Sequence, residues 1–373
     1  MTKRILFIIA RYSISGVPLA QMKLARAFQS KGYQVDILFG YVSEGLVLPV
    51  IEGIAITDLG LSKTYKLLMP IVAFVRKNKP DIVFSAEDHL NAIVAIALIV
   101  AGSKAKLSVS SRVNPFDTYP NRLFSKGTVL KQLMRVVIFR ADALTCVSKA
   151  MVEQYRTIFR KAPHVYAYNI IDDDTTRQRM LEPLDAPWFL QNDGIPTLVA
   201  AGRLEACKGF DTLINALSEL VKTRQARLLI LGDGPDRAEL ERLVESNGLQ
   251  HAIRLPGYVS NPLKYFHNAD VFVLSSRLEG LPNVLVEAML CGCTPVATDC
   301  PTGPREVLDD GKYGYLIAMN DPIAMSEAIK TALENPMSEA LLKEAIVPFS
   351  QDAVIGRYLD IFGPNVFSME VKE

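Results

Sequence analysis

The chain has 373 residues, 49% of them hydrophobic and 22% charged, and its formal net charge is +1. This length with an ordinary globular composition is typical of two domains. The apolar runs at residues 5–10 and 92–101 are too short for a signal-peptide core and for a membrane span, which excludes both, so we expect a cytoplasmic protein.

The first half of the chain alternates between strand and helix patterns. Residues 4–10 are a continuous apolar run, typical of a parallel strand buried on both faces, and a polar loop at 13–18 leads to a helix at 19–30. The elements predicted next are strand 33–39, helix 66–78, strand 81–84, helix 91–100 and strand 107–110. This alternation predicts an α/β domain with a doubly wound parallel sheet.

A segment rich in Asp, Pro, Asn and Gly at residues 173–196 interrupts the alternation and predicts a linker. The pattern then restarts with strand 197–201, helix 210–222, strand 227–231, helix 236–247, strand 254–256, strand 271–275, helix 282–291 and strand 295–298, and an amphipathic helix follows at 352–362. We therefore predict a first domain at 1–172, a second at 197–350 and a C-terminal segment at 351–373.

The small net charge hides a difference between the two halves. Residues 1–170 contain 23 Lys and Arg against 10 Asp and Glu, a net of +13, while the rest contains 18 against 30, a net of −12. This asymmetry predicts an anionic partner for the first half, with chance drift between two surfaces as the alternative. Two stretches, 63–79 and 123–140, combine cations with apolar residues and could lie in an anionic membrane interface, or simply pack on the first sheet.

Two cations lie five residues apart in the loop after strand 197–201. Arg203 and Lys208, in the sequence Gly-Arg-Leu-Glu-Ala-Cys-Lys-Gly, could hold a diphosphate, with Arg as a planar fork and Lys as a point charge. The alternative is a pair of solvated surface cations.

Two carboxylates flank the start of helix 282–291. Pro282 suits the first turn of that helix, which puts Glu279 on the preceding loop and Glu287 about two turns in, roughly 10 Å away along the axis. That distance is too long for a shared proton but suits one group at a sugar and one at a ribose. The free amides of the first turn favour an anion.

Weaker signals lie at three other strand ends. Gly16, in the loop after the first strand, allows backbone amides to approach a phosphate, although G-x-G-x-x-G is absent. Gly232-Asp-Gly-Pro and Gly257-Tyr258 also follow strands, and Tyr258 could stack on a base or simply pack. The five cysteines form no metal-ligand cluster, so no metal site is predicted.

Together these motifs resemble the retaining glycosyltransferases of family 4. The resemblance is carried by Gly202-Arg203-Leu-x3-Lys208-Gly209, Leu231-Gly-Asp-Gly-Pro235, Gly257-Tyr258, Glu279-x7-Glu287 and Thr298-Asp-Cys-Pro-Thr-Gly-Pro-Arg305-Glu306. It covers essentially the whole chain and is densest at 197–320. The chain looks most like the bacterial branch that builds lipopolysaccharide cores, capsules and lipid-linked glycans.

The resemblance implies a GT-B fold, in which two Rossmann-like domains face each other across a cleft and the last helix crosses back to the N-terminal domain. It implies a nucleoside diphosphate sugar as donor, UDP-linked in our interpretation, a glycan or glycolipid acceptor, an α linkage, and no cofactor, metal or nucleic acid. The roles that it implies are diphosphate binding by Arg203 and Lys208, ribose binding by Glu287, contact of Glu279 with the transferred sugar, and amide contacts around Gly280, Leu281 and Asn283.

Two family features are matched only in part. The N-terminal loop usually has two adjacent glycines, whereas this chain has only Gly16, and His89 lies near the place of a histidine that many relatives have. We predict that the loop at Gly16 contacts a phosphate and that His89 lies on the acceptor side. For His89 the alternative is a polar, non-catalytic histidine. The alternative functions are a sugar-nucleotide epimerase or a phosphorylase of the same fold, or a non-catalytic nucleotide-sugar-binding protein.

Overall fold

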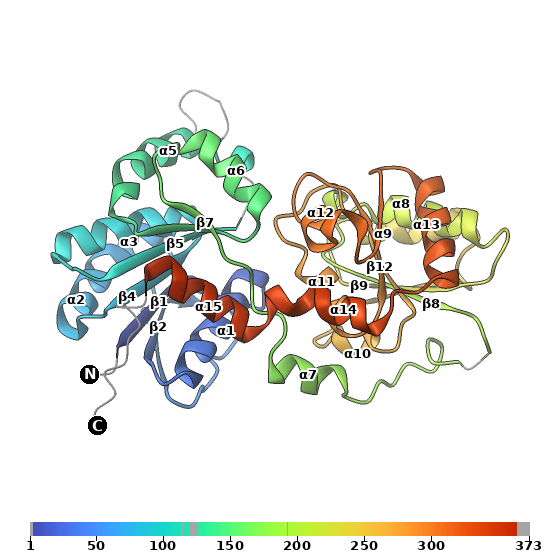
Figure 1. The fold of residues 1–373 in the computed structure, drawn as a ribbon, viewed down its shortest axis with the longest axis horizontal. Helices are drawn as coiled ribbons and strands as arrows, with labels where there is room; N and C mark the ends of the chain where they lie inside the picture. The colour runs from blue at the N-terminus through green and yellow to red at the C-terminus, as the bar shows by residue number, and fades with distance from the viewer. Residues whose placement is uncertain (1–2, 113–114, 120–125, 192, 364–373) are drawn as a thin grey trace. The chain divides into compact units, whose positions relative to one another are not determined.

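The computed structural model describes residues 3–112, 115–119, 126–191 and 193–363, and it divides the chain into two compact units (Figure 1). The first unit comprises Met1–Ile170 together with Gln351–Glu373, and the second comprises Ile171–Ser350. Each unit has a parallel sheet with helices around it, which confirms the predicted α/β class with two Rossmann-like domains.

The first unit is built on a seven-stranded sheet in the order β3-β2-β1-β4-β5-β6-β7. Its strands are β1 (Arg4–Tyr12), β2 (Gln34–Val42), β3 (Ile54–Asp58), β4 (Ile82–Ala86), β5 (Lys106–Ser111), β6 (Ala143–Cys146) and β7 (His164–Tyr166). Its α-helices are α1 (Gly16–Ser30), α2 (Leu68–Asn78), α3 (Asp88–Ala101), α4 (Pro115–Thr118), α5 (Lys126–Val137), α6 (Lys149–Ile158) and α15 (Gln351–Phe362). The apolar run of β1 is fully buried from Ile5 to Ile9, as expected of a strand covered on both faces.

The second unit has a six-stranded sheet in the order β10-β9-β8-β11-β12-β13. Its strands are β8 (Thr197–Ala201), β9 (Arg227–Leu231), β10 (Ile253–Gly257), β11 (Val271–Leu274), β12 (Thr294–Thr298) and β13 (Tyr315–Ile317). Its α-helices are α7 (Asp174–Met180), α8 (Phe210–Leu220), α9 (Arg237–Ser246), α10 (Leu263–Phe266), α11 (Asn283–Leu290), α12 (Pro304–Val307), α13 (Pro322–Glu334) and α14 (Glu339–Ile346). Strand order reverses between β8 and β11, the switch point at which open α/β sheets bind ligands.

The C-terminal helix α15 packs on the first unit, as the GT-B resemblance implied (Figure 1). The buried Tyr358 ring lies 5.3 Å from the ring of Phe84 on β4, measured between centroids, and 6.2 Å from that of Phe28 on α1. Lys31 Nζ also lies 2.7 Å from an Asp352 carboxylate oxygen. An aromatic core therefore joins residues that are more than 270 positions apart in the chain.

The segment predicted as a linker, 173–196, belongs to the second unit instead. Asp173 accepts a hydrogen bond from the Thr176 amide at 2.7 Å and caps α7. Arg179 then donates to the Ser260 carbonyl at 2.5 Å, and Asn261 donates to the Arg179 carbonyl at 2.8 Å. Asp173, one of the residues that suggested a free loop, therefore caps a helix of the second unit.

Candidate functional site

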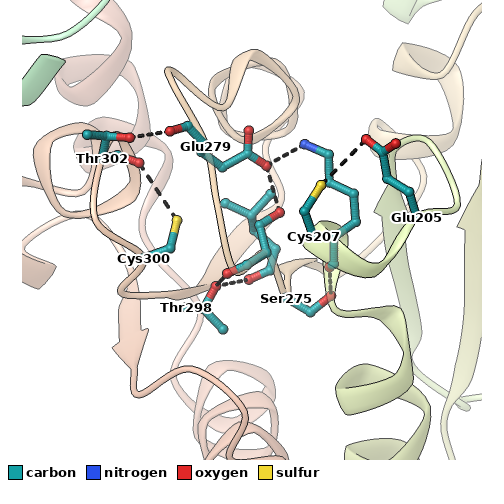
Figure 2. A network of polar contacts seen from close by, with 10 residues as sticks. Glu205, Cys207, Ser275, Glu279, Thr298, Cys300 and Thr302 are labelled. Carbon is teal, nitrogen blue, oxygen red and sulfur yellow. Dashed lines mark hydrogen bonds and ion pairs between the residues drawn. The ribbon is translucent and has the colours of Figure 1, made fainter. Parts of the chain in front are cut away.

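Two loops meet at the switch point of the second sheet, one after β8 and one after β11 (Figure 2). The first loop carries Arg203 and passes through a short 3₁₀ helix, η3 (Ala206–Lys208), and the second carries Glu279. Ser275 Oγ donates a hydrogen bond to the Lys208 carbonyl at 2.8 Å, and the Arg277 amide donates to the Cys207 carbonyl at 2.7 Å. These bonds hold the two loops side by side.

An ion pair between the two loops forms the centre of the site. Lys208 Nζ donates to Glu279 Oε1 at 2.7 Å, with the Lys208 side chain 21% exposed and that of Glu279 8% exposed. Ser276 Oγ donates to the same oxygen at 2.6 Å, and Thr302 Oγ1 donates to the Glu279 backbone carbonyl. The structure thus brings together one predicted phosphate cation and the predicted sugar-contacting carboxylate.

Burial around this pair also affects a neighbouring thiol. Burial, together with the negative charge of Glu279, raises the pKa of Cys300 to about 12. The thiol donates to the Thr302 carbonyl at 3.7 Å, as Figure 2 shows. Cys300 is therefore a neutral packing residue at neutral pH and not a nucleophile.

Glycines allow the close approach of these loops. Gly209 has a φ of +64°, and a Cβ atom there would lie 2.1 Å from the Ser275 carbonyl oxygen. Gly232, after β9, has a φ of +140°, and its Cβ would lie 1.9 Å from the Gly202 carbonyl oxygen. No side chain fits at either place, so the Gly-rich motifs are explained by backbone contact between loops.

Arg203 is placed differently from Lys208. Its side chain is 70% exposed, and its Nε lies 3.4 Å from a Glu205 carboxylate oxygen. A surface pair of this kind is weak, so the guanidinium can leave it for a stronger anion at little cost. Tyr258, which follows β10, is 62% exposed.

The start of α11 corrects one sequence prediction. The helix begins at Asn283, and Pro282 is its N-cap residue instead of lying in the first turn. The Asn283 amide donates to the Leu281 carbonyl at 2.9 Å, so in this structure that predicted donor is bonded within the loop. Gly280 and Glu287 are half-buried and Leu281 is buried.

The remaining predicted residues lie on the first unit, at its own switch point between β1 and β4. Gly16 is exposed at the start of α1. His89 is in the first turn of α3, 51% exposed, with Nε2 3.4 Å from a Glu87 carboxylate oxygen. The two strands that precede them are paired in the sheet.

The sequence analysis missed the buried carboxyl group next to His89. Asp88 is 7% exposed and accepts hydrogen bonds from Ser111 Oγ at 2.5 Å and from the Tyr155 hydroxyl at 2.8 Å. Burial raises its pKa even though these donors favour the charged form. The signal in the sequence was the run Glu87-Asp88-His89 at a strand end, of which only the histidine was singled out.

The residues that the structure describes contain no group of three or more His, Cys, Asp or Glu side chains suited to a metal ion. In the acidic run at 172–174, Asp172 pairs with Arg177 at 2.6 Å and Asp173 caps α7. Across the same described ranges, no helix combines the length and the apolar character that crossing a bilayer requires.

Comparison with known proteins identifies relatives over both units. The model for Glycosyltransferase Family 4 matches residues 14–175, and that for Glycosyl transferases group 1 matches residues 188–346. An uncharacterized glycosyltransferase of Methanocaldococcus jannaschii is 31% identical over 317 residues, 78% of this chain and 75% of that protein.

Two more similarities extend this finding. The N-acetylgalactosamine-N,N'-diacetylbacillosaminyl-diphospho-undecaprenol 4-alpha-N-acetylgalactosaminyltransferase of Campylobacter jejuni is 31% identical over 65% of this chain and 64% of its own length. Among solved structures, Anabaena HepE in complex with UDP superimposes with a TM-score of 0.79 at 17% identity, over 96% of this chain and 99% of that one. At this identity the structural likeness shows a shared fold.

Proposed function

Because this chain belongs to glycosyltransferase family 4 and has the GT-B fold, we propose that it transfers a sugar from a nucleoside diphosphate sugar to a growing surface glycan or lipid-linked acceptor. The observation that carries the proposal is the Lys208–Glu279 pair at the switch point of the second sheet. It puts a cation for a diphosphate and a carboxylate for sugar hydroxyls in one place.

The reaction follows from this pairing of charges. The bond from the anomeric carbon to the diphosphate oxygen breaks, and a bond to the acceptor oxygen forms on the same face. Negative charge grows on the leaving diphosphate, where the positive charges of Lys208 and Arg203 stabilise it. The leaving phosphate oxygen takes the proton of the acceptor hydroxyl, so we assign no protein general base.

The finer details of the donor and product rest on the relatives. The Campylobacter jejuni relative is named as an α-linking N-acetylgalactosaminyltransferase, and the Anabaena structure holds UDP. These names support a UDP-linked donor and an α product, which amounts to retention at the anomeric carbon if the donor is α-configured. A hexosyl or N-acetylhexosaminyl group fits both.

A donor panel separates transfer from the alternatives. We expect one nucleotide sugar to raise the melting temperature and to release nucleoside diphosphate faster when an acceptor is present. Change of the donor sugar without acceptor would indicate an epimerase. Stabilisation with no release under any condition would indicate a non-catalytic binding protein and would contradict the proposal.

The carboxylates of Glu279 and Glu287 are expected to differ in their kinetic effects. Glu287→Ala should weaken binding of free nucleoside diphosphate by about 10- to 100-fold, since it removes a charged hydrogen-bond partner of the ribose. Glu279→Ala should leave that affinity near wild type and lower kcat. Calorimetry and steady-state kinetics distinguish the two, with the exposed Glu245→Ala as a control. The reverse pattern would contradict the assigned roles.

Turnover is expected to survive chelation by EDTA, because protein cations take the place of a divalent metal at the diphosphate. The measurement is the initial rate of nucleotide release before and after EDTA treatment, and again after adding Mg²⁺ or Mn²⁺. A strict requirement for either ion would contradict metal independence.

We also propose contact with an anionic membrane through the first unit, in which residues 1–170 carry a net charge of +13. On α5, Met134 and Val137 are buried, yet Val129 and Val136 remain 67% and 74% exposed on a second apolar face. Phe139, just beyond the helix, is 71% exposed. Packing on the sheet therefore does not account for all the apolar residues of this segment.

Vesicle sedimentation tests the membrane contact. Binding should increase with anionic lipid content and fall with salt, since each basic residue near the surface contributes about 1 kcal/mol. The triple variant Lys126→Glu, Lys131→Glu, Arg135→Glu should bind more weakly than a control with the same charge change in the second unit: Lys222→Glu, Arg242→Glu, Lys343→Glu. Equal binding of both variants would contradict contact through α5.

A further inference from the structure

The first unit contains an arginine whose charge has no ionic partner among the residues that the structure describes. Arg112 directly follows β5, and its Nη1 donates to Asn169 Oδ1 at 2.5 Å. Its Nε is buried and forms no hydrogen bond with any residue that the structure describes. No ion pair joins it to a carboxylate in the described ranges, although the residue as a whole is only half-buried.

Two other half-buried arginines, Arg4 and Arg277, are paired with carboxylates. Arg4 Nε lies 2.6 Å from an Asp36 carboxylate oxygen, and Arg277 Nη2 lies 2.7 Å from one of Asp211. A guanidinium stays charged in proteins, and a desolvated charge without a partner destabilises the fold. Burial lowers the pKa of Arg112, which reflects this cost. An anion that bound beside the Arg112 guanidinium would compensate its charge and remove this cost.

Arg112 follows a strand next to the one that precedes His89, the predicted acceptor-side residue. The strand before Arg112, β5, pairs with β4, which ends just before Glu87 and His89. The Glu87 amide donates to the Ser110 carbonyl at 3.1 Å, and Glu87 has a φ of +79°, a costly conformation for a residue with a side chain. The negative charge of Glu87 favours the charged form of Arg112, but the two form no ion pair.

We propose that Arg112 binds a phosphate group of the acceptor at the carboxyl end of the first sheet. The inference rests on the proposed glycosyl transfer, for which it names the acceptor as a phosphorylated molecule. The guanidinium offers a planar fork that matches phosphate oxygens, and the basic first half of the chain attracts such an anion. Arg112 positions the acceptor and takes no part in breaking or forming bonds.

The test measures phosphate binding without turnover. The background is the variant Arg203→Gln, Lys208→Gln, Glu279→Gln, which removes the donor cations and neutralises both members of the ion pair together. Inorganic phosphate should still raise its melting temperature relative to chloride at equal ionic strength. Adding Arg112→Gln should weaken phosphate binding by about 10- to 100-fold, whereas adding the exposed Arg156→Gln should not.

Stability separates this role from a structural one. Without phosphate, Arg112→Gln should melt at or above the temperature of its parent, because it removes an uncompensated charge. A second probe, geranyl diphosphate, shows which kind of acceptor carries the phosphate. Tighter binding of geranyl diphosphate than of inorganic phosphate indicates a lipid-linked acceptor, and equal binding of the two indicates a soluble acceptor. An unchanged phosphate shift in Arg112→Gln, or a lower melting temperature without phosphate, would overturn the proposal. Both outcomes are independent of whether any donor is turned over.

Discussion

Lys208→Ala is expected to lower kcat/KM for glycosyl transfer by about 10²- to 10³-fold, the cost of losing one charge contact to the leaving group. Lys208 is 21% exposed and fixed at 2.7 Å from Glu279, so its ammonium group is already in place before the diphosphate develops charge. Lys208→Arg should recover only part of the rate, because a planar fork does not replace a compact point charge in the same space.

A matched lysine controls for charge and for general destabilisation. Lys222, just after α8 in the same unit, makes a 2.7 Å ion pair with Glu219 and is 62% exposed. Lys222→Ala should therefore change neither turnover nor stability appreciably. Steady-state kinetics well below the melting temperature of each variant gives the comparison, and similar rates for Lys208→Ala and Lys222→Ala would remove Lys208 from the donor site.

Gly209→Ala is expected to cost about 2–5 kcal/mol of unfolding free energy, combining a left-handed backbone with an overpacked contact. The added Cβ would lie 2.1 Å from the Ser275 carbonyl oxygen, a backbone atom that moves only with its loop. Since Ser275 also donates to the Lys208 carbonyl, the shift should separate Lys208 from Glu279 and reduce donor binding as well.

Gly248 provides a control with the same backbone conformation. Its φ is +67°, close to the +64° of Gly209, but no atom lies within 4 Å of the Cβ that alanine would add. Gly248→Ala should lower the unfolding free energy only by the cost of a left-handed backbone at alanine, about 1–2 kcal/mol. Denaturant unfolding measures both variants, and equal losses would show that the loop contact at Gly209 does not constrain the site.

Continuous apolar runs made part of the fold predictable from the sequence. The predicted strands 197–201 and 227–231 coincide with β8 and β9, because runs of Val, Leu and Ile covered on both faces leave little ambiguity. The edge strand β3, the four-residue strand β6 and the three-residue strands β7 and β13 were not predicted. Short or half-covered strands have too few residues for a clear pattern.

The site was predictable only at the level of motifs. The sequence located Lys208 and Glu279 at strand ends, but their ion pair depends on two loops 71 residues apart and on the backbone contact at Gly209. Arg112 belongs to no motif, and Asp88 was marked only by the run Glu87-Asp88-His89 at a strand end. Their significance comes from burial and from the partners they have or lack, which one-dimensional patterns do not contain.

The central claim is glycosyl transfer from a nucleoside diphosphate sugar, and the most direct measurement is the balance of its products. With the donor that stabilises the protein and a matching acceptor, one equivalent of nucleoside diphosphate should appear for each glycosylated acceptor, and proton NMR should show an α linkage. Release of nucleotide without a glycosylated product, or a β linkage from an α donor, would contradict this account.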